Sequence, residues 1–135
     1  MLHEGGQAYS RMRFGLTTSL LVGAYFQYEY NAYDCAQDRY WYDEYDNAGT
    51  QQTGYLGTPI NQAYQLNDNK GVYRRDFRNG ITLCNTTPAK KTVDLGGTYF
   101  RIRGTQDPET NNGQSATQLT LNRMDGIVLL NQPTP

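Results

Sequence analysis

Residues 71–85, GVYRRDFRNGITLCN, decide the fold class of this chain. We expect residues 72–77 to form one strand and residues 81–85 to return as the next, because β-branched and aromatic side chains favour strands. Asn79-Gly80 lies between them and supplies a tight turn that tolerates positive φ. The stretch therefore predicts a β-hairpin.

Short strands continue beyond this hairpin. Residues 92–104, TVDLGGTYFRIRG, predict two strands around Gly96-Gly97, and residues 105–116 predict a long loop. TQLTLN (117–122) and GIVLLN (126–131) predict the last two strands, with a turn near Asp125-Gly126.

Six short strands with tight turns, and no helix between them, indicate an antiparallel sandwich or small barrel. Its inward face is expected to consist of aliphatic residues that alternate along the strands. These are Val72, Ile81, Leu83, Val93, Leu95, Ile102, Leu119, Leu121, Ile127 and Leu129. Arg74 and Arg75, beside Asp76, predict an ion-paired face of the sheet.

The N-terminal region differs in character. Residues 8–22, AYSRMRFGLTTSLLV, predict a helix that ends at Gly23. Its apolar residues recur at about one-turn spacing: Ala8, Met12, Leu16 and Leu20. Residues 24–31, AYFQYEYN, are aromatic at nearly every second position and predict a strand.

The expected fold class is therefore mainly β, an antiparallel β-sandwich preceded by one helix–strand unit. We divide the chain into a terminal α/β unit (residues 1–47), a Gly/Thr/Gln-rich linker (48–54) and the C-terminal sandwich domain (55–135).

Composition and charge exclude several function classes. The 135 residues include 12 tyrosines and have a formal net charge of −1, so no basic excess exists to bind nucleic acid. The longest apolar run, residues 15–26, is too short and too polar to span a membrane.

Abundant Tyr, Asn, Gln, Thr and Gly, with a mean hydropathy of −0.77, are typical of a secreted β-rich protein. We therefore expect an extracellular location, although residues 1–13 lack the pattern of a signal peptide, so the chain has lost a leader or begins inside a longer parent.

Residues 40–49, YWYDEYDNAG, combine aromatic rings with carboxylates. Such a loop suits a surface that binds a sugar, and equally a loop that packs under a neighbouring layer. The candidate sugar-stacking residues are Tyr40, Trp41, Tyr42 and Tyr45. The alternative for Trp41 is a core anchor between this loop and the sandwich.

Carboxylates near this loop are candidates for glycoside hydrolysis, which needs two carboxyl groups on opposite sides of the scissile bond. The catalytic candidates are Glu29, Asp43 and Glu44, with Asp46 beside them. Neighbouring acids on one loop rarely flank a bond from both faces, so a solvated or Arg-paired loop is the alternative. We expect no cofactor.

The remaining motifs predict weaker sites. Cys35 and Cys84 could be two buried thiols or one disulfide, and the lone His3 gives no zinc-binding pattern. Residues 107–113, DPETNNG, suit an Asx-rich turn, or a calcium site with oxygen ligands. The ligands of such a site would be Asp107, Glu109, Asn111 and Asn112. Asn85 begins a glycosylation acceptor motif, NTT.

The order of these motifs resembles the C-terminal part of glycoside hydrolase-like proteins, over about residues 9–130. The closest likeness lies in WYDEYD (41–46), in the RRDFRNG hairpin (74–80) and in LGGTY (95–99). The resemblance implies the last helix and strand of a (β/α)₈ barrel, a loop at its catalytic face, and an appended β-sandwich. It also implies that the second catalytic carboxylate lies on an earlier strand of a longer chain, and that Cys35 and Cys84 form a disulfide joining loop and sandwich.

The function expected from sequence is a non-catalytic fragment or accessory β-domain of a secreted glycoside hydrolase-like protein. The helix stripe at residues 8–22 and the strand at residues 24–30 would lack their barrel neighbours, so we expect other copies of the chain, or a missing barrel segment, as partners. A structural subunit that self-associates into an oligomer or filament is the favoured form. The alternatives are a carbohydrate-binding module whose partner is a polysaccharide, and part of an active glycosidase on a longer chain.

Overall fold

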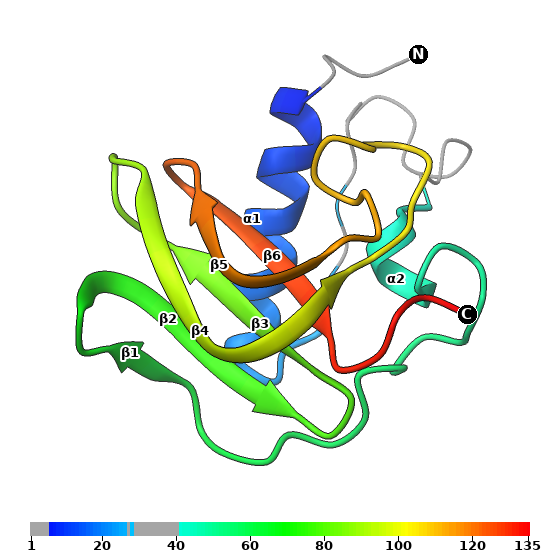
Figure 1. Cartoon of the computed structure of the whole chain (residues 1–135), viewed down its shortest axis with the longest axis horizontal. Helices are drawn as coiled ribbons and strands as arrows, with labels where there is room; N and C mark the ends of the chain where they lie inside the picture. Colours follow the sequence, from blue (N-terminus) through cyan, green and yellow to red (C-terminus); the bar gives the residue numbers. More distant parts are fainter. Residues whose placement is uncertain (1–5, 27, 29–40) are drawn as a thin grey trace.

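A computed structural model of the chain describes residues 6–26, 28 and 41–135, with the backbone alone for residues 6–8. The elements in order are α1 (Gly6–Val22), α2 (Asp43–Asp46), β1 (Tyr64–Leu66), β2 (Asn69–Phe77), β3 (Gly80–Asn85), β4 (Lys91–Arg101), β5 (Ser115–Leu121) and β6 (Asp125–Leu130). The six strands form one antiparallel sheet in the order β1-β2-β3-β6-β4-β5. The mainly-β, antiparallel fold preceded by a helix is confirmed, and the sheet curls into half a barrel with α1 along one face (Figure 1).

The β2–β3 hairpin is confirmed, with Val72 opposite Asn85 and Phe77 opposite Gly80. The reason for its glycine differs from the prediction, because neither Asn79 nor Gly80 has positive φ. A side chain at Gly80 would instead overlap the backbone carbonyl of Leu129 on β6. Glycine is therefore needed here for a close backbone approach between β3 and β6.

β4 is one strand, so the prediction of two strands around Gly96-Gly97 is wrong. Gly96 has φ of +71°, and the pairing with β5 shifts register between Asp94 and Tyr99. This irregularity bends β4, because an unpaired insertion increases the local twist of a strand. The first half of β4 pairs with β5 alone, while Phe100 and Arg101 also pair with β6, and this bend produces the curl seen in Figure 1.

The last two strands are confirmed as β5 and β6. The turn between them lies at Arg123–Met124, where Met124 has φ of 48°, rather than at Asp125-Gly126. The short edge strand β1 had no counterpart in the prediction, since its three residues are half-buried at most.

Apolar residues bury both faces of the central strands β3 and β6. Inside the curl lies one cluster, made of Val72, Ile81, Leu83, Val93, Leu95, Leu119, Leu121, Ile127 and Leu129. A second cluster lies between the outer face and the helices, made of Met12, Leu16, Tyr42, Leu56, Phe77, Ile102, Val128 and Leu130. All ten residues predicted to face inward are buried, and Ile102 alone belongs to the second cluster.

Helix α1 and its C-terminal stop at Gly23 are confirmed. Gly23 has φ of +73°, the amide of Ala24 donates to Ser19 O at 2.9 Å, and Arg75 on β2 donates to Leu20 O at 3.1 Å. Free carbonyls and the helix dipole at this end are thereby satisfied.

Arg74 forms the predicted ion pair with Asp76, at 2.8 Å, whereas Arg75 binds carbonyls.

The apolar stripe of α1 covers the sheet. Met12 is fully buried and Leu16 is 9% exposed, both against residues of the second cluster, so the expectation of an uncovered helix stripe is wrong. Residues 24–26 and 28 are neither helix nor strand, so the strand predicted there is wrong for these residues, while residues 27 and 29–31 lie outside the described ones. Within the described residues, neither helix has the length and apolar character needed to cross a membrane.

Candidate functional site

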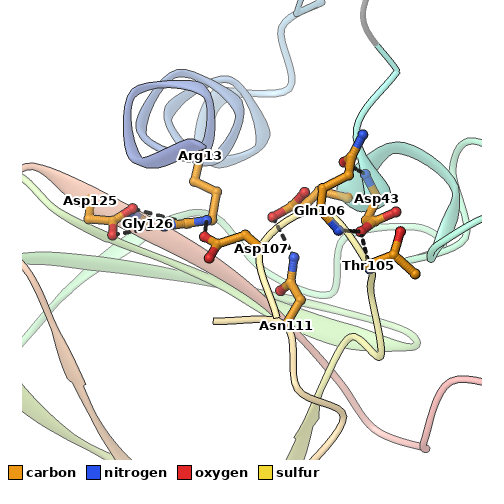
Figure 2. Close-up of polar contacts among 9 residues, drawn as sticks. Arg13, Asp43, Thr105, Gln106, Asp107, Asn111, Asp125 and Gly126 are labelled. Carbon is orange, nitrogen blue, oxygen red and sulfur yellow. Dashed lines mark hydrogen bonds and ion pairs between the residues drawn. The ribbon is translucent and has the colours of Figure 1, made fainter. Parts of the chain in front are cut away.

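A buried polar cluster lies where α1, α2 and the loop after β4 meet (Figure 2). Arg13 on α1 is 3% exposed and donates to both oxygens of Asp125 on β6, each at 3.2 Å. Its third nitrogen donates to Asp107 Oδ2 in the loop at 2.7 Å. One guanidinium therefore joins the helix to the sheet and to the loop, and its fork geometry suits such multiple bonding.

The charges in this cluster act on one another strongly because little water reaches them. Burial would lower the pKa of Arg13, but Asp125 and Asp107 outweigh it and the pKa of Arg13 is raised. Burial raises the pKa of Asp125, against the opposing effect of Arg13 and of the hydrogen bond from the Gly126 amide. Arg13 therefore remains charged and compensates the buried carboxylates.

Glu44 on α2 is the second buried carboxyl group of the cluster. It is 6% exposed, and its Oε2 accepts a hydrogen bond of 2.9 Å from Asn111 Nδ2. Burial raises its pKa, and Asn111 and Arg13 only partly offset that effect. Glu44 therefore holds its proton to higher pH than an exposed glutamate does.

Asp43 fastens α2 to the loop. Its Oδ2 accepts hydrogen bonds from the amides of Thr105, at 2.8 Å, and Gln106, at 3.1 Å. In return Gln106 accepts from the Asp43 amide at 2.8 Å and donates to Trp41 O at 2.6 Å. A side chain at Gly104 would overlap Asp43 Oδ2, so the glycine lets the loop approach this carboxylate.

The acids of residues 43–46 therefore all accept hydrogen bonds from other groups of the chain. Asp46 accepts from Trp41 Nε1 at 2.8 Å and from the Gly49 amide at 2.9 Å. This arrangement stabilises the junction of helix, loop and sheet. Among the acids of residues 43–46 it leaves no pair that faces an open sugar site, and Glu29, the third catalytic candidate, lies outside the described residues.

The aromatic residues of this segment divide between core and surface. Tyr42 is 1% exposed and makes edge-to-face contacts with Tyr9, Tyr28 and Tyr45. Trp41 is 56% exposed and packs edge-on against Tyr45, whose pKa burial raises to about 12. Tyr40 lies outside the described residues. These tyrosine rings therefore form a core around Tyr42. Among the described candidates for sugar stacking, Trp41 alone presents an exposed ring face.

The four candidate calcium ligands have separate roles. Asp107 pairs with Arg13, Asn111 binds Glu44, and the side-chain oxygen of Asn112 accepts from the Gln114 amide at 2.9 Å. Glu109 is exposed. Among the described residues, no group of three or more His, Cys, Asp or Glu side chains could hold a metal ion.

Asn85 and Cys84 are buried at the end of β3. Asn85 Nδ2 donates to Ala89 O at 2.8 Å and Asn122 O at 2.9 Å, and its Oδ1 accepts from Thr87. Glycan attachment at Asn85 would therefore have to precede folding. Cys84 is fully buried, with its Sγ 3.7 Å from Thr18 Oγ1, and Cys35 lies outside the described residues, so their disulfide stays a prediction.

Sequence reasoning missed the centre of the cluster, Arg13 and Asp125. A signal existed in α1, because Arg13 and Thr17 lie one turn apart and each is rotated by about 100° from the stripe residue before it, so the pair flanks the apolar stripe. Their burial, at 3% and 0% exposure, confirms that the covered face of α1 is wider than its apolar stripe.

Comparison with known proteins gives one result. Residues 2–81, more than half of the chain, match the family described as hypothetical glycosyl hydrolase family 15. The match spans α1, α2, β1 and β2, and it confirms the glycoside hydrolase-like resemblance at this level. No curated protein and no solved structure matches the chain.

Proposed function

This chain belongs to hypothetical glycosyl hydrolase family 15, and from that we propose that it is a non-catalytic accessory module of a glycoside hydrolase-like protein. The observation that carries the proposal is the use of its candidate acids. Glu44 is buried against Asn111, and Asp43 is bound to two loop amides. Asp43 and Glu44 are neighbours on α2, a helix of four residues.

A glycosidase needs two carboxyl groups that flank the bond from opposite sides and reach it directly. Glu44, 6% exposed, cannot approach a sugar without opening the junction with the loop. Asp43 would have to release the amides of Thr105 and Gln106 before its Oδ2 could act as a nucleophile or base. The cost of breaking such charge-assisted bonds argues for a stabilising role.

The stacking surface predicted from Tyr40, Trp41, Tyr42 and Tyr45 receives less support than the accessory role. Tyr42 is buried, so at most Trp41 and the edge of Tyr45 would meet a sugar among the described rings. An extracellular location, a barrel on a longer parent chain and self-association belong to the same proposal. The two sheet edges, β1 and β5, are the surfaces where another chain would add, since an unpaired strand edge is a template for pairing.

The proposal is tested by hydrolysis of a panel of chromogenic aryl glycosides and dyed polysaccharides. We expect no turnover above the buffer rate from the purified chain. Turnover by the wild type that is lost in Glu44→Gln or Asp43→Asn, but kept in the exposed control Glu109→Gln, would overturn it. Circular dichroism of each variant shows whether a loss of turnover reflects unfolding.

A further inference from the structure

The curl of the sheet leaves a pocket on the side of the molecule away from the buried cluster. It has a volume of about 450 Å³ and lies between residues 64–69, which comprise β1, the turn after it and the first residue of β2, and the first half of β4 with the middle of β5. Pockets of roughly 300–1,000 Å³ are typical of small-molecule sites. The pocket is therefore large enough for one or two sugar rings.

The pocket exists because β4 crosses β2 without joining it in the sheet. Side chains bridge this seam: Asn69 Nδ2 donates to Thr92 O at 2.9 Å, and Arg74 donates to Leu95 O at 2.7 Å. Figure 1 shows the first half of β4 passing across β2 near β1. Both walls of the pocket are thus held at a fixed separation, and Asn69 and Thr92 belong to its lining.

Several polar groups in the lining remain available to a ligand. The side chains of Asp68 and Gln118 are exposed and form no hydrogen bond with the residues that the structure describes. Asp94 uses one carboxylate oxygen for the Gly96 amide, at 3.0 Å, and has the other to spare. Tyr64 is 40% exposed and supplies an aromatic ring at the same opening.

We propose that this pocket binds a neutral saccharide. Carboxylate oxygens accept from sugar hydroxyls, an amide both donates and accepts, and a tyrosine ring offers an apolar face beside a polar tip. Two carboxylates with no Lys or Arg in the lining disfavour an anionic ligand, and Leu66 is its one aliphatic residue, which disfavours an apolar ligand. The proposal rests on the proposed function only for its choice of carbohydrate as the ligand class.

The test is an NMR titration of the ¹⁵N-labelled chain with cellotriose, xylotriose, maltotriose, mannotriose and chitotriose. We expect saturable shifts for residues 64–69, Thr92, Asp94 and Gln118 with at least one of these sugars. Asp68→Ala and Gln118→Ala remove unbonded side chains, so they should leave the spectrum folded and weaken that binding by about tenfold each. Glu109→Ala, which removes an exposed carboxylate outside the lining, is the matched control and should leave the affinity unchanged.

Three results would overturn the proposal. One is the absence of shifts with every sugar, and another is a set of shifts that centres on Trp41 instead. The third is a response of the same residues to calcium chloride but to no sugar, which would identify a cation site. None of these outcomes affects the accessory, non-catalytic role, because that role is tested by hydrolysis.

Discussion

Replacing Arg13 by methionine should destabilise this protein more than any other single change at a charged residue. Arg13 is 3% exposed and makes three hydrogen bonds to carboxylates, two to Asp125 at 3.2 Å and one to Asp107 at 2.7 Å. Methionine keeps the length of the side chain and removes its charge. The substitution therefore leaves two buried carboxyl groups without their cation.

The magnitude follows from the burial of those partners. Asp125 and Asp107 have side chains only 7% and 13% exposed. Removing one partner of a buried pair costs about 3–5 kcal/mol. Part of this cost should disappear at pH 5, because Asp125, whose pKa burial raises, can take up a proton and so avoid an unpaired buried charge.

Urea unfolding followed by circular dichroism measures the effect. Arg123→Met, at an exposed arginine, is the matched control and should stay within about 0.5 kcal/mol of wild type. Asp125→Asn should cost much less in the Arg13→Met background than in wild type, with a coupling energy above ~1 kcal/mol. A loss below ~1 kcal/mol for Arg13→Met, or simple additivity with Asp125→Asn, would refute the reasoning.

Three further predictions concern stability. Because burial raises the pKa of Glu44, the folded state keeps this proton where the unfolded chain has lost it, so wild-type stability should fall as pH rises through that window. Glu44→Gln should flatten this fall and be the more stable protein at pH 8, while Glu109→Gln should follow wild type; identical pH profiles for all three would contradict this. A methyl group at Gly126 would overlap Thr17 on α1, so Gly126→Ala should cost about 1–3 kcal/mol, whereas Gly97→Ala meets only an ordinary contact with Tyr99. Equal urea midpoints for these two alanine variants would argue against the close packing of α1 on β6. Leu83→Ala should cost about 2–5 kcal/mol in the same urea assay, and a cost below ~0.5 kcal/mol would mean that the inward face is wrong.

The β2–β3 hairpin could be predicted from sequence because its signals are local. A two-residue connection and strand-forming residues on either side lie within fifteen positions. Helix α1 has a local signal too, with a one-turn repeat and a glycine stop. These elements depend little on contacts with distant parts of the chain.

The bend of β4 could not be predicted from local sequence signals. Gly96-Gly97 has the composition of a turn, yet β5 pairs with the strand on both sides of it and β6 pairs with Phe100 and Arg101, and this pairing keeps the chain extended. Edge strand β1 has only three residues, too few for alternation to identify a strand, and its first two residues are exposed while the third is half-buried. Both outcomes depend on tertiary pairing rather than on local preference.

The candidate site also combines residues that local sequence identifies with contacts that only the tertiary fold creates. The sequence identified Asp43 and Glu44 by residue type, but their roles depend on the loop at residues 105–111, more than sixty positions away. Arg13 meets Asp107 and Asp125 across separations of 94 and 112 residues. No local pattern encodes contacts of that range, so a carboxylate that stabilises the fold looks, in sequence, like one that acts on a substrate.

The central claim is that the acids of α2 stabilise the junction with the loop rather than act in hydrolysis. Amide hydrogen exchange by NMR in Asp43→Ala tests it most directly, because the amides of Thr105 and Gln106 donate to this carboxylate. We predict that both amides exchange about tenfold faster or more than in wild type, while amides of β3 such as Leu83 keep their rates. Unchanged exchange at Thr105 and Gln106 would contradict the account.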